Sequence, residues 1–138
     1  MSHLTITSGD FEFTGRLEED LAPLTTAWFK DQLPFHSSVV HARWSGEAVW
    51  IPLGDLESGL PLENHTVHPS RGDLLFYPGG ISETELLFPY GSAAFASKAG
   101  SLAGNHFLTL TSGHERLLEF GNHVLYSGEQ TIEFTLTD

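Results

Sequence analysis

The sequence contains no cysteine. Disulfide bonds, thiol nucleophiles and cysteine-ligated zinc sites are therefore excluded. Basic residues are also scarce, because 6 lysines and arginines stand against 18 aspartates and glutamates, for a formal net charge of −12. Nucleic-acid binding relies on Lys and Arg contacts to phosphate, so this charge argues against a nucleic-acid partner and against binding to anionic membranes.

Long apolar runs are lacking as well. No stretch approaches the ~20 residues needed to cross a bilayer, and the first residues, MSHLTITSGDFEF, lack the basic and apolar regions of a secretory signal. We therefore expect a soluble cytoplasmic protein. The chain of 138 residues is 40% hydrophobic and 17% charged, which predicts a single globular domain over residues 1–138.

Short segments of alternating apolar and polar residues dominate the chain and predict a mainly β protein. The expected strands cover residues 3–7, 11–14, 38–44, 47–52, 73–77, 83–88, 106–111 and 131–136, with a further extended piece at 124–126. Many short strands in a chain of this size favour a closed or nearly closed eight-stranded β-barrel. One longer and one short helix would plug its ends.

The longer helix is expected over residues 17–33. Pro23 suits its first turn, and Pro34 enforces its end. Helical spacing places Leu24, Ala27 and Trp28 on its buried face, with Trp28 as a core anchor.

The short helix is expected over residues 114–120. Ser112 is the candidate N-cap and Gly121 the glycine that ends the helix.

The segment from Arg71 to His106 combines the densest turn chemistry with the most suggestive polar residues. We expect its strands to break at residues 78–80 (Pro-Gly-Gly) and again at 89–91 (Pro-Tyr-Gly). Glu83 and Glu85 lie two apart, so in a strand they share one face, about 6–7 Å apart. Two carboxylates that close raise one another's pKa, which suits general acid–base catalysis, although a solvated strand face would also explain the pair.

His106 is the third candidate catalytic residue, because histidine titrates near neutral pH. A hydrogen-bonded structural histidine is the alternative. The candidate ligand-binding residues are the scarce cations, the aromatic residues and an amide that surround this segment. They are Arg43, Trp50, Tyr77, Tyr90, Lys98 and Asn105. Packing of the aromatic residues, and a salt bridge of Arg43 at the barrel rim, are the simpler readings.

No metal site or cofactor is expected. His65 and His68 could each offer a nitrogen, but no third ligand follows at a recognisable spacing. The two glycines Gly79 and Gly80 lack the lysine and the following helix of a phosphate loop.

Four stretches carry a resemblance to a known family. They are RWSGEAVWIPLGD (43–55), GDLLFYPGGISETELLFPYG (72–91), FASKAGSLAGNHF (95–107) and FGNHVLYSGEQ (120–130). On these stretches the sequence resembles DUF3830, a bacterial family of unknown function with a cyclophilin-like fold. The resemblance implies an eight-stranded barrel. The Arg-x-x-x-x-Phe-x-x-Gln pattern of prolyl isomerases is missing around Arg43, so we expect a protein that is not a typical prolyl isomerase.

Two functional hypotheses remain. The first is a barrel that binds a small molecule beside the strand–turn–strand at residues 73–88. The second is an enzyme acting on an amide or cyclic amide, with Glu83 or Glu85 and His106 as acid–base groups. In either case we expect a homo-oligomer, with a symmetric dimer as the commonest outcome.

Overall fold

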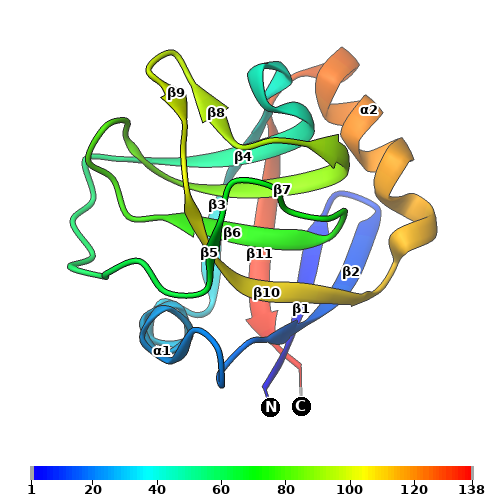
Figure 1. Ribbon diagram of the computed structural model, residues 1–138. Helices are drawn as coiled ribbons and strands as arrows, with labels where there is room; N and C mark the ends of the chain where they lie inside the picture. Colours follow the sequence, from blue (N-terminus) through cyan, green and yellow to red (C-terminus); the bar gives the residue numbers. More distant parts are fainter. Residues whose placement is uncertain (1, 138) are drawn as a thin grey trace.

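The structure is a computed structural model that describes residues 2–137, and its strands wrap into an antiparallel barrel (Figure 1). In chain order the strands are β1 (His3–Ser8), β2 (Phe11–Leu17), β3 (Phe35–His41), β4 (Gly46–Gly54), β5 (His65–Thr66), β6 (Asp73–Tyr77), β7 (Thr84–Ala93), β8 (Ala96–Ser97), β9 (Gly100–Ser101), β10 (Gly104–Ser112) and β11 (Gln130–Leu136). The helices are α1 (Pro23–Asp31) and α2 (Leu117–Ser127), and short 3-10 turns lie at η1 (Arg43–Ser45) and η2 (His114–Arg116).

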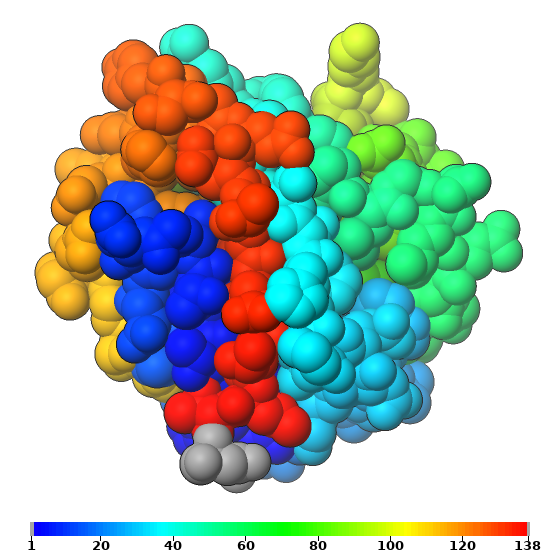
Figure 2. Space-filling view, turned by 180° about the vertical axis from the view of Figure 1, so that it is seen from behind, coloured from blue at the N-terminus to red at the C-terminus, as the bar shows by residue number. Residues whose placement is uncertain are grey.

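Eight strands close the barrel. Their order is β2-β1-β11-β3-β4-β7-β6-β10, and β10 pairs back onto β2. Figure 2 shows β1, β11 and β3 side by side on the back of the molecule, so the first and last strands of the chain are neighbours. The predicted eight-stranded barrel is confirmed. Closure leaves these eight strands without a free edge for pairing with another chain.

Each helix contributes a phenylalanine to the barrel interior. Phe29 of α1 and Phe120 of α2 are fully buried. The Phe29 ring lies 5.0 to 5.4 Å from the rings of Phe35, Phe107 and Phe134. The Phe120 ring lies 5.4 to 5.6 Å from those of Phe11, Phe13 and Phe88. Aromatic packing from two opposite sides of the barrel therefore fills its core (Figure 1).

A second, smaller apolar cluster lies on the outer face of β4, β6 and β7. The residues that flank the β8–β9 hairpin cover this face, because Phe95 and Leu102 are buried against Leu75, Tyr77 and Leu87. As a result β7 is buried on both faces from Thr84 to Tyr90. A strand covered on both sides is apolar at nearly every position, which explains the run Leu86-Leu87-Phe88.

Helix α1 is shorter than predicted. It begins at Pro23 because the chain up to Leu17 pairs in β2, and it ends at Asp31, before Pro34. The proline in its first turn is as expected.

The buried face of α1 differs from the prediction too. Thr25, Thr26 and Phe29 are buried, whereas Leu24 is 54% exposed. Trp28 packs against the core, with its ring 5.0 Å from that of Phe76.

Helix α2 is the longer of the two helices. The sequence predicted a short helix over residues 114–120 and an extended piece at 124–126, but the helix continues to Ser127. Neither predicted cap is correct: Ser112 belongs to β10, and Gly113 precedes η2. Gly121 lies inside the helix and allows it to approach the ring of Tyr90.

Two strand boundaries also differ from the prediction. The turn at residues 78–80 forms as expected, with Gly79 and Gly80 at φ 92° and 122°. The expected break at residues 89–91 does not occur, because β7 continues past it next to an irregularity in the register of β4. Pro89 has no N–H to donate, but its carbonyl accepts a hydrogen bond from the N–H of Gly72. Residues 43–45 form η1 rather than the end of a strand.

Gly121→Ala tests the close approach of α2 to the barrel. Alanine normally stabilises a helix interior by about 0.5–1 kcal/mol relative to glycine. Here its Cβ would overlap the Tyr90 ring, so we expect a loss of about 1–3 kcal/mol, as in other overpacked cores. Urea unfolding measures the change. Asn122→Ala, at the exposed neighbouring position, is the control and should be neutral or stabilising. A stabilised Gly121→Ala variant would contradict the packing described.

Candidate functional site

A hollow of about 640 Å³ lies on the outer wall of the barrel, beside the β8–β9 hairpin. We call it the tryptophan hollow. It is lined by Trp44, Trp50, Ile81, Ser82, Glu83, Glu85, Ser97, Lys98 and Ala99. Four of the residues selected from the sequence, Trp50, Glu83, Glu85 and Lys98, thus line one hollow.

Strand register places Glu85 and Trp50 on the same outer face. Glu85 lies opposite Pro52 of β4 and opposite Tyr77 of β6, while Trp50 lies opposite Leu87. Glu85 and Trp50 are therefore diagonal neighbours across β4 and β7, with Cα atoms about 7–8 Å apart.

The loop that carries Glu83 is held by Tyr77. The hydroxyl oxygen of Tyr77 accepts hydrogen bonds from the backbone N–H groups of Ile81, at 2.9 Å, and Ser82, at 3.3 Å. Tyr77 itself is buried, with its ring 5.9 Å from that of Phe95. Tyr77 therefore positions one rim of the hollow rather than lining it.

Two tryptophans form the aromatic wall. Trp44 projects from η1 and is 52% exposed, and its ring packs edge-to-face on Trp50 with centroids 5.4 Å apart. The indole N–H of Trp50 is buried and has no hydrogen-bond partner among residues 2–137. An aromatic surface beside an unpartnered donor can hold a ligand that is apolar on one side and accepts a hydrogen bond on the other.

The Glu85 carboxyl group is the most unusual polar group in the hollow. The residue is only 3% exposed, and its Oε2 has no hydrogen-bond partner within the described part of the chain. Burial, and secondarily the charge of Glu83, raise the pKa of Glu85 to about 8. At neutral pH this group is therefore mostly a neutral carboxylic acid, which can donate as well as accept a hydrogen bond.

The β8–β9 hairpin contributes Lys98 to the lining of the hollow. Phe95 and Leu102 anchor the base of the hairpin in the outer cluster. Ser45 adds a polar anchor, because its hydroxyl oxygen accepts a hydrogen bond from the N–H of Ala96 at 3.1 Å. Lys98 lies near the exposed tip, which projects from the body of the molecule (Figure 2).

His106 does not line this hollow. It lies on β10 opposite Leu75, and its Nε2 is 2.7 Å from the Thr109 hydroxyl and 3.5 Å from Asp73 Oδ1. Strand spacing and rise separate its Cα atom from that of Glu85 by about 12 Å. The structure thus brings Glu83 and Glu85 together without His106.

The hydrogen-bond network around His106 continues through Thr109 to Glu18 and Arg16. The Thr109 hydroxyl donates to Glu18, which also accepts from Arg16 at 3.0 Å. Burial acts to raise the pKa of Glu18, but the hydrogen bonds from Thr109 and Arg16 lower it overall. These groups connect β2 to β10, which is a structural role.

Asn105 is fully buried and does not line the hollow. Its side-chain oxygen accepts from the N–H of Glu63, and its amide donates to the hydroxyl of Thr25 and to the carbonyl of Pro61, each at 3.0 Å. Asn105 therefore joins α1 and the 61–63 loop to β10.

Tyr90 and Arg43 also lie outside the hollow. The Tyr90 hydroxyl is 2.7 Å from Nε2 of His41, and burial, with the charge of Glu47, raises the Tyr90 pKa. Arg43 is exposed on η1, next to Trp44 but not among the lining residues. Its charge and, more strongly, burial lower the pKa of His41.

Sequence reasoning did not select Trp44, Ile81 or Ser82. The sequence predicted Trp44 in the strand over residues 38–44, whereas it lies in η1. The turn residues Ser45 and Gly46 give a signal, since Ser45 ends η1, Gly46 caps it, and the Trp44 side chain in this turn is 52% exposed. Ile81 is 71% exposed. An apolar residue in a predicted turn is the sequence feature that could have indicated its place in the hollow.

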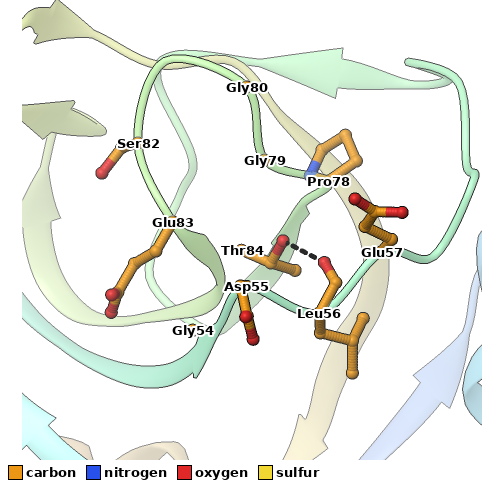
Figure 3. A pocket seen from close by; sticks show the side chains of 10 residues that line it. All are labelled: Gly54, Asp55, Leu56, Glu57, Pro78, Gly79, Gly80, Ser82, Glu83 and Thr84. Atoms are coloured by element: carbon orange, nitrogen blue, oxygen red, sulfur yellow. Dashed lines mark hydrogen bonds between the residues drawn. The ribbon is translucent and has the colours of Figure 1, made fainter.

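A second, shallower hollow of about 470 Å³ adjoins the first (Figure 3). Ser82 and Glu83 line both. Figure 3 shows the side chains of Glu83 and Glu57 on opposite sides of it, and the Thr84 hydroxyl donating to the Leu56 carbonyl at 2.7 Å. Within residues 2–137, no group of three His, Asp or Glu residues could hold a metal ion, and no helix is long and apolar enough to cross a membrane.

Comparison with known proteins identifies a family and a fold. The family model for proteins of unknown function DUF3830 matches residues 4–136. No curated protein matches significantly. McbB in complex with tryptophan superposes with a TM-score of 0.71 at 16% identity, over 96% of this chain and 44% of McbB. The hypothetical protein AF2241 from Archaeoglobus fulgidus superposes with a TM-score of 0.63 at 17% identity, over 99% of this chain and 95% of AF2241.

The buried Glu85 predicts a pH-dependent stability. The unfolded chain loses the Glu85 proton near the ordinary pKa of 4.5, whereas the folded protein holds it to about 8. The free energy of unfolding therefore falls as pH rises between these values, by up to roughly 5 kcal/mol. Glu85→Gln should remove this contribution to the pH dependence. The free energy of unfolding of the variant should therefore increase relative to that of the wild type as pH rises.

Urea unfolding at pH 4, 6 and 9 measures the effect. Glu57→Gln, at an exposed position outside the tryptophan hollow, is the matched control and should follow the wild type at each pH. Parallel pH profiles for Glu85→Gln and the wild type would show that Glu85 ionises normally.

Proposed function

We propose that the chain, which belongs to the DUF3830 family of proteins of unknown function, binds a small organic molecule in the tryptophan hollow. Three buried side-chain polar atoms among residues 2–137 have no hydrogen-bond partner, and the observation that carries the proposal is that two of them, Glu85 Oε2 and Trp50 Nε1, belong to residues lining this hollow. A buried polar group left unpaired costs about 1–3 kcal/mol. A ligand that pairs with either atom would recover part of that cost on binding.

The size and chemistry of the hollow support the same proposal. Its volume of about 640 Å³ falls within the usual range for small-molecule sites. Its walls combine two indole rings and Ile81 with a few polar groups, Glu83, Glu85 and Lys98. Such a site favours a ligand with an apolar, preferably planar, body and a polar end.

McbB suggests a probe, because a protein with the same fold has been obtained in complex with tryptophan. This chain spans 44% of McbB, and the identity of 16% carries the fold alone. L-Tryptophan is therefore a reasonable first probe.

The hypothesis of an amide-directed enzyme is weaker than the binding proposal. It required His106 beside the carboxylates, whereas His106 is engaged by Thr109 and Asp73 outside the hollow. The expected homodimer remains a prediction, which light scattering tests.

Binding is tested by titrating L-tryptophan and a panel of aromatic and aliphatic metabolites against the protein by NMR. Trp44→Ala removes an exposed wall of the hollow, and tryptophans at binding sites often contribute more than 1.4 kcal/mol, so we expect at least about a tenfold weaker affinity. Tyr126→Ala, which removes an aromatic side chain 83% exposed on α2, should bind like the wild type.

Trp50→Phe isolates the unpartnered N–H. The variant keeps an aromatic ring and loses the buried donor, so its free energy of unfolding should stay the same or rise slightly. Its affinity for ligands that accept this hydrogen bond should fall about tenfold. If nothing in the panel shifts resonances of the hollow in the wild type, the proposal fails.

A further inference from the structure

The groups in the hollow also restrict the class of ligand. We infer that the ligand is a basic amine with an apolar body, whose ammonium group binds between Glu83 and Glu85, and that its binding drives the proton off Glu85. This inference rests on the proposed function and deepens it.

Both carboxylates are available to a cation. Glu83 is exposed at the rim, and no residue among 2–137 forms a salt bridge with it. Glu85, at the floor, has the unpartnered Oε2. An ammonium group has three donors and no acceptor, so it can pair with both carboxylates at once. A carboxylate or phosphate ligand would instead meet the repulsion of Glu83.

The aromatic wall suits the same ligand. The Trp44 ring stands at the rim with half of its surface exposed. A cation over the face of a tryptophan gains about 0.5–2 kcal/mol, depending on how far it is desolvated. The apolar body of the ligand would then lie along Trp50 and Ile81.

The proton balance is simple. In solution below pH 9 an alkyl amine is already an ammonium ion, and it remains one when bound. Glu85 is protonated in the free protein at neutral pH, because burial raises its pKa to about 8. On binding, the Glu85 O–H bond breaks, the proton passes to the buffer, and the carboxylate left behind pairs with the ammonium.

The other charged and titratable groups around Glu85 are few. Glu83 lies on the preceding loop, Tyr77 on β6 opposite Glu85, and Lys98 on the hairpin. Strand β4 contributes Pro52 and Trp50, and η1 contributes Trp44, none of which titrates. Lys98 disfavours a second positive charge, so the inference is for monoamines.

Three matched probes test the ligand class: phenethylamine, 2-phenylethanol and 3-phenylpropionate share a ring and differ in the charge at the polar end. We expect phenethylamine to bind at least about tenfold more tightly than the other two. If the alcohol or the acid binds as tightly as the amine, or if the amine does not bind, the inference is wrong. Binding of neutral or anionic members of the wider panel would then leave the proposed function standing.

Calorimetry in two buffers of different ionisation enthalpy measures the released proton. At pH 7 the wild type should release most of one proton per phenethylamine bound, and the release should decline as pH rises through the Glu85 pKa. Affinity should rise about tenfold per pH unit up to pH 7 and level off above pH 8.

Glu85→Gln should bind the amine more weakly and abolish the proton release, whereas Glu57→Gln should behave like the wild type. Amine binding by the wild type without proton release would overturn the role of Glu85, even if the variant failed to fold.

Discussion

The outer apolar cluster, in which Phe95 and Leu102 pack on Leu75, Tyr77 and Leu87, is the interaction on which the site depends. A closed barrel has one interior, and the rest of its wall normally faces water. Here the residues flanking the hairpin cover part of the outer face of the barrel, so β7 is buried on both faces. Burying several large apolar side chains stabilises the fold by about 1.5–3 kcal/mol for each one, and that gain fixes where the hairpin lies.

Glu85 occupies the edge of the covered region, and this position explains its unusual state. Strand alternation puts it on the same face as Leu87, so it is drawn out of water together with the apolar cluster. Burial raises the pKa of Glu85, and the negative charge of Glu83 raises it further. The result is a carboxyl group that the fold desolvates without supplying a hydrogen-bond partner for Oε2.

Local sequence patterns predicted the barrel, most strands and the turn at residues 78–80, because all of these depend on alternation and turn chemistry. They could not predict the full length of α2. Glycine commonly ends a helix, but Gly121 lies inside α2 because the Tyr90 ring packs against it and leaves no room for a side chain. They could not place Trp44, whose direction depends on η1. The partners of His106 were equally hidden, because its network reaches Glu18, which is 91 residues from Thr109.

The hydrogen-bond network of His106 and the tryptophan hollow illustrate the difference between a structural and a functional arrangement of polar groups. In the network of His106, Thr109 and Glu18, hydrogen bonds satisfy the partly buried groups and join two strands. In the tryptophan hollow, the buried atoms Glu85 Oε2 and Trp50 Nε1 have no partner. Native proteins rarely leave buried polar atoms unpaired, and a ligand is one of the few ways to pair them without rebuilding the fold. For this reason the second arrangement, rather than the histidine, is where a function of this protein is to be sought.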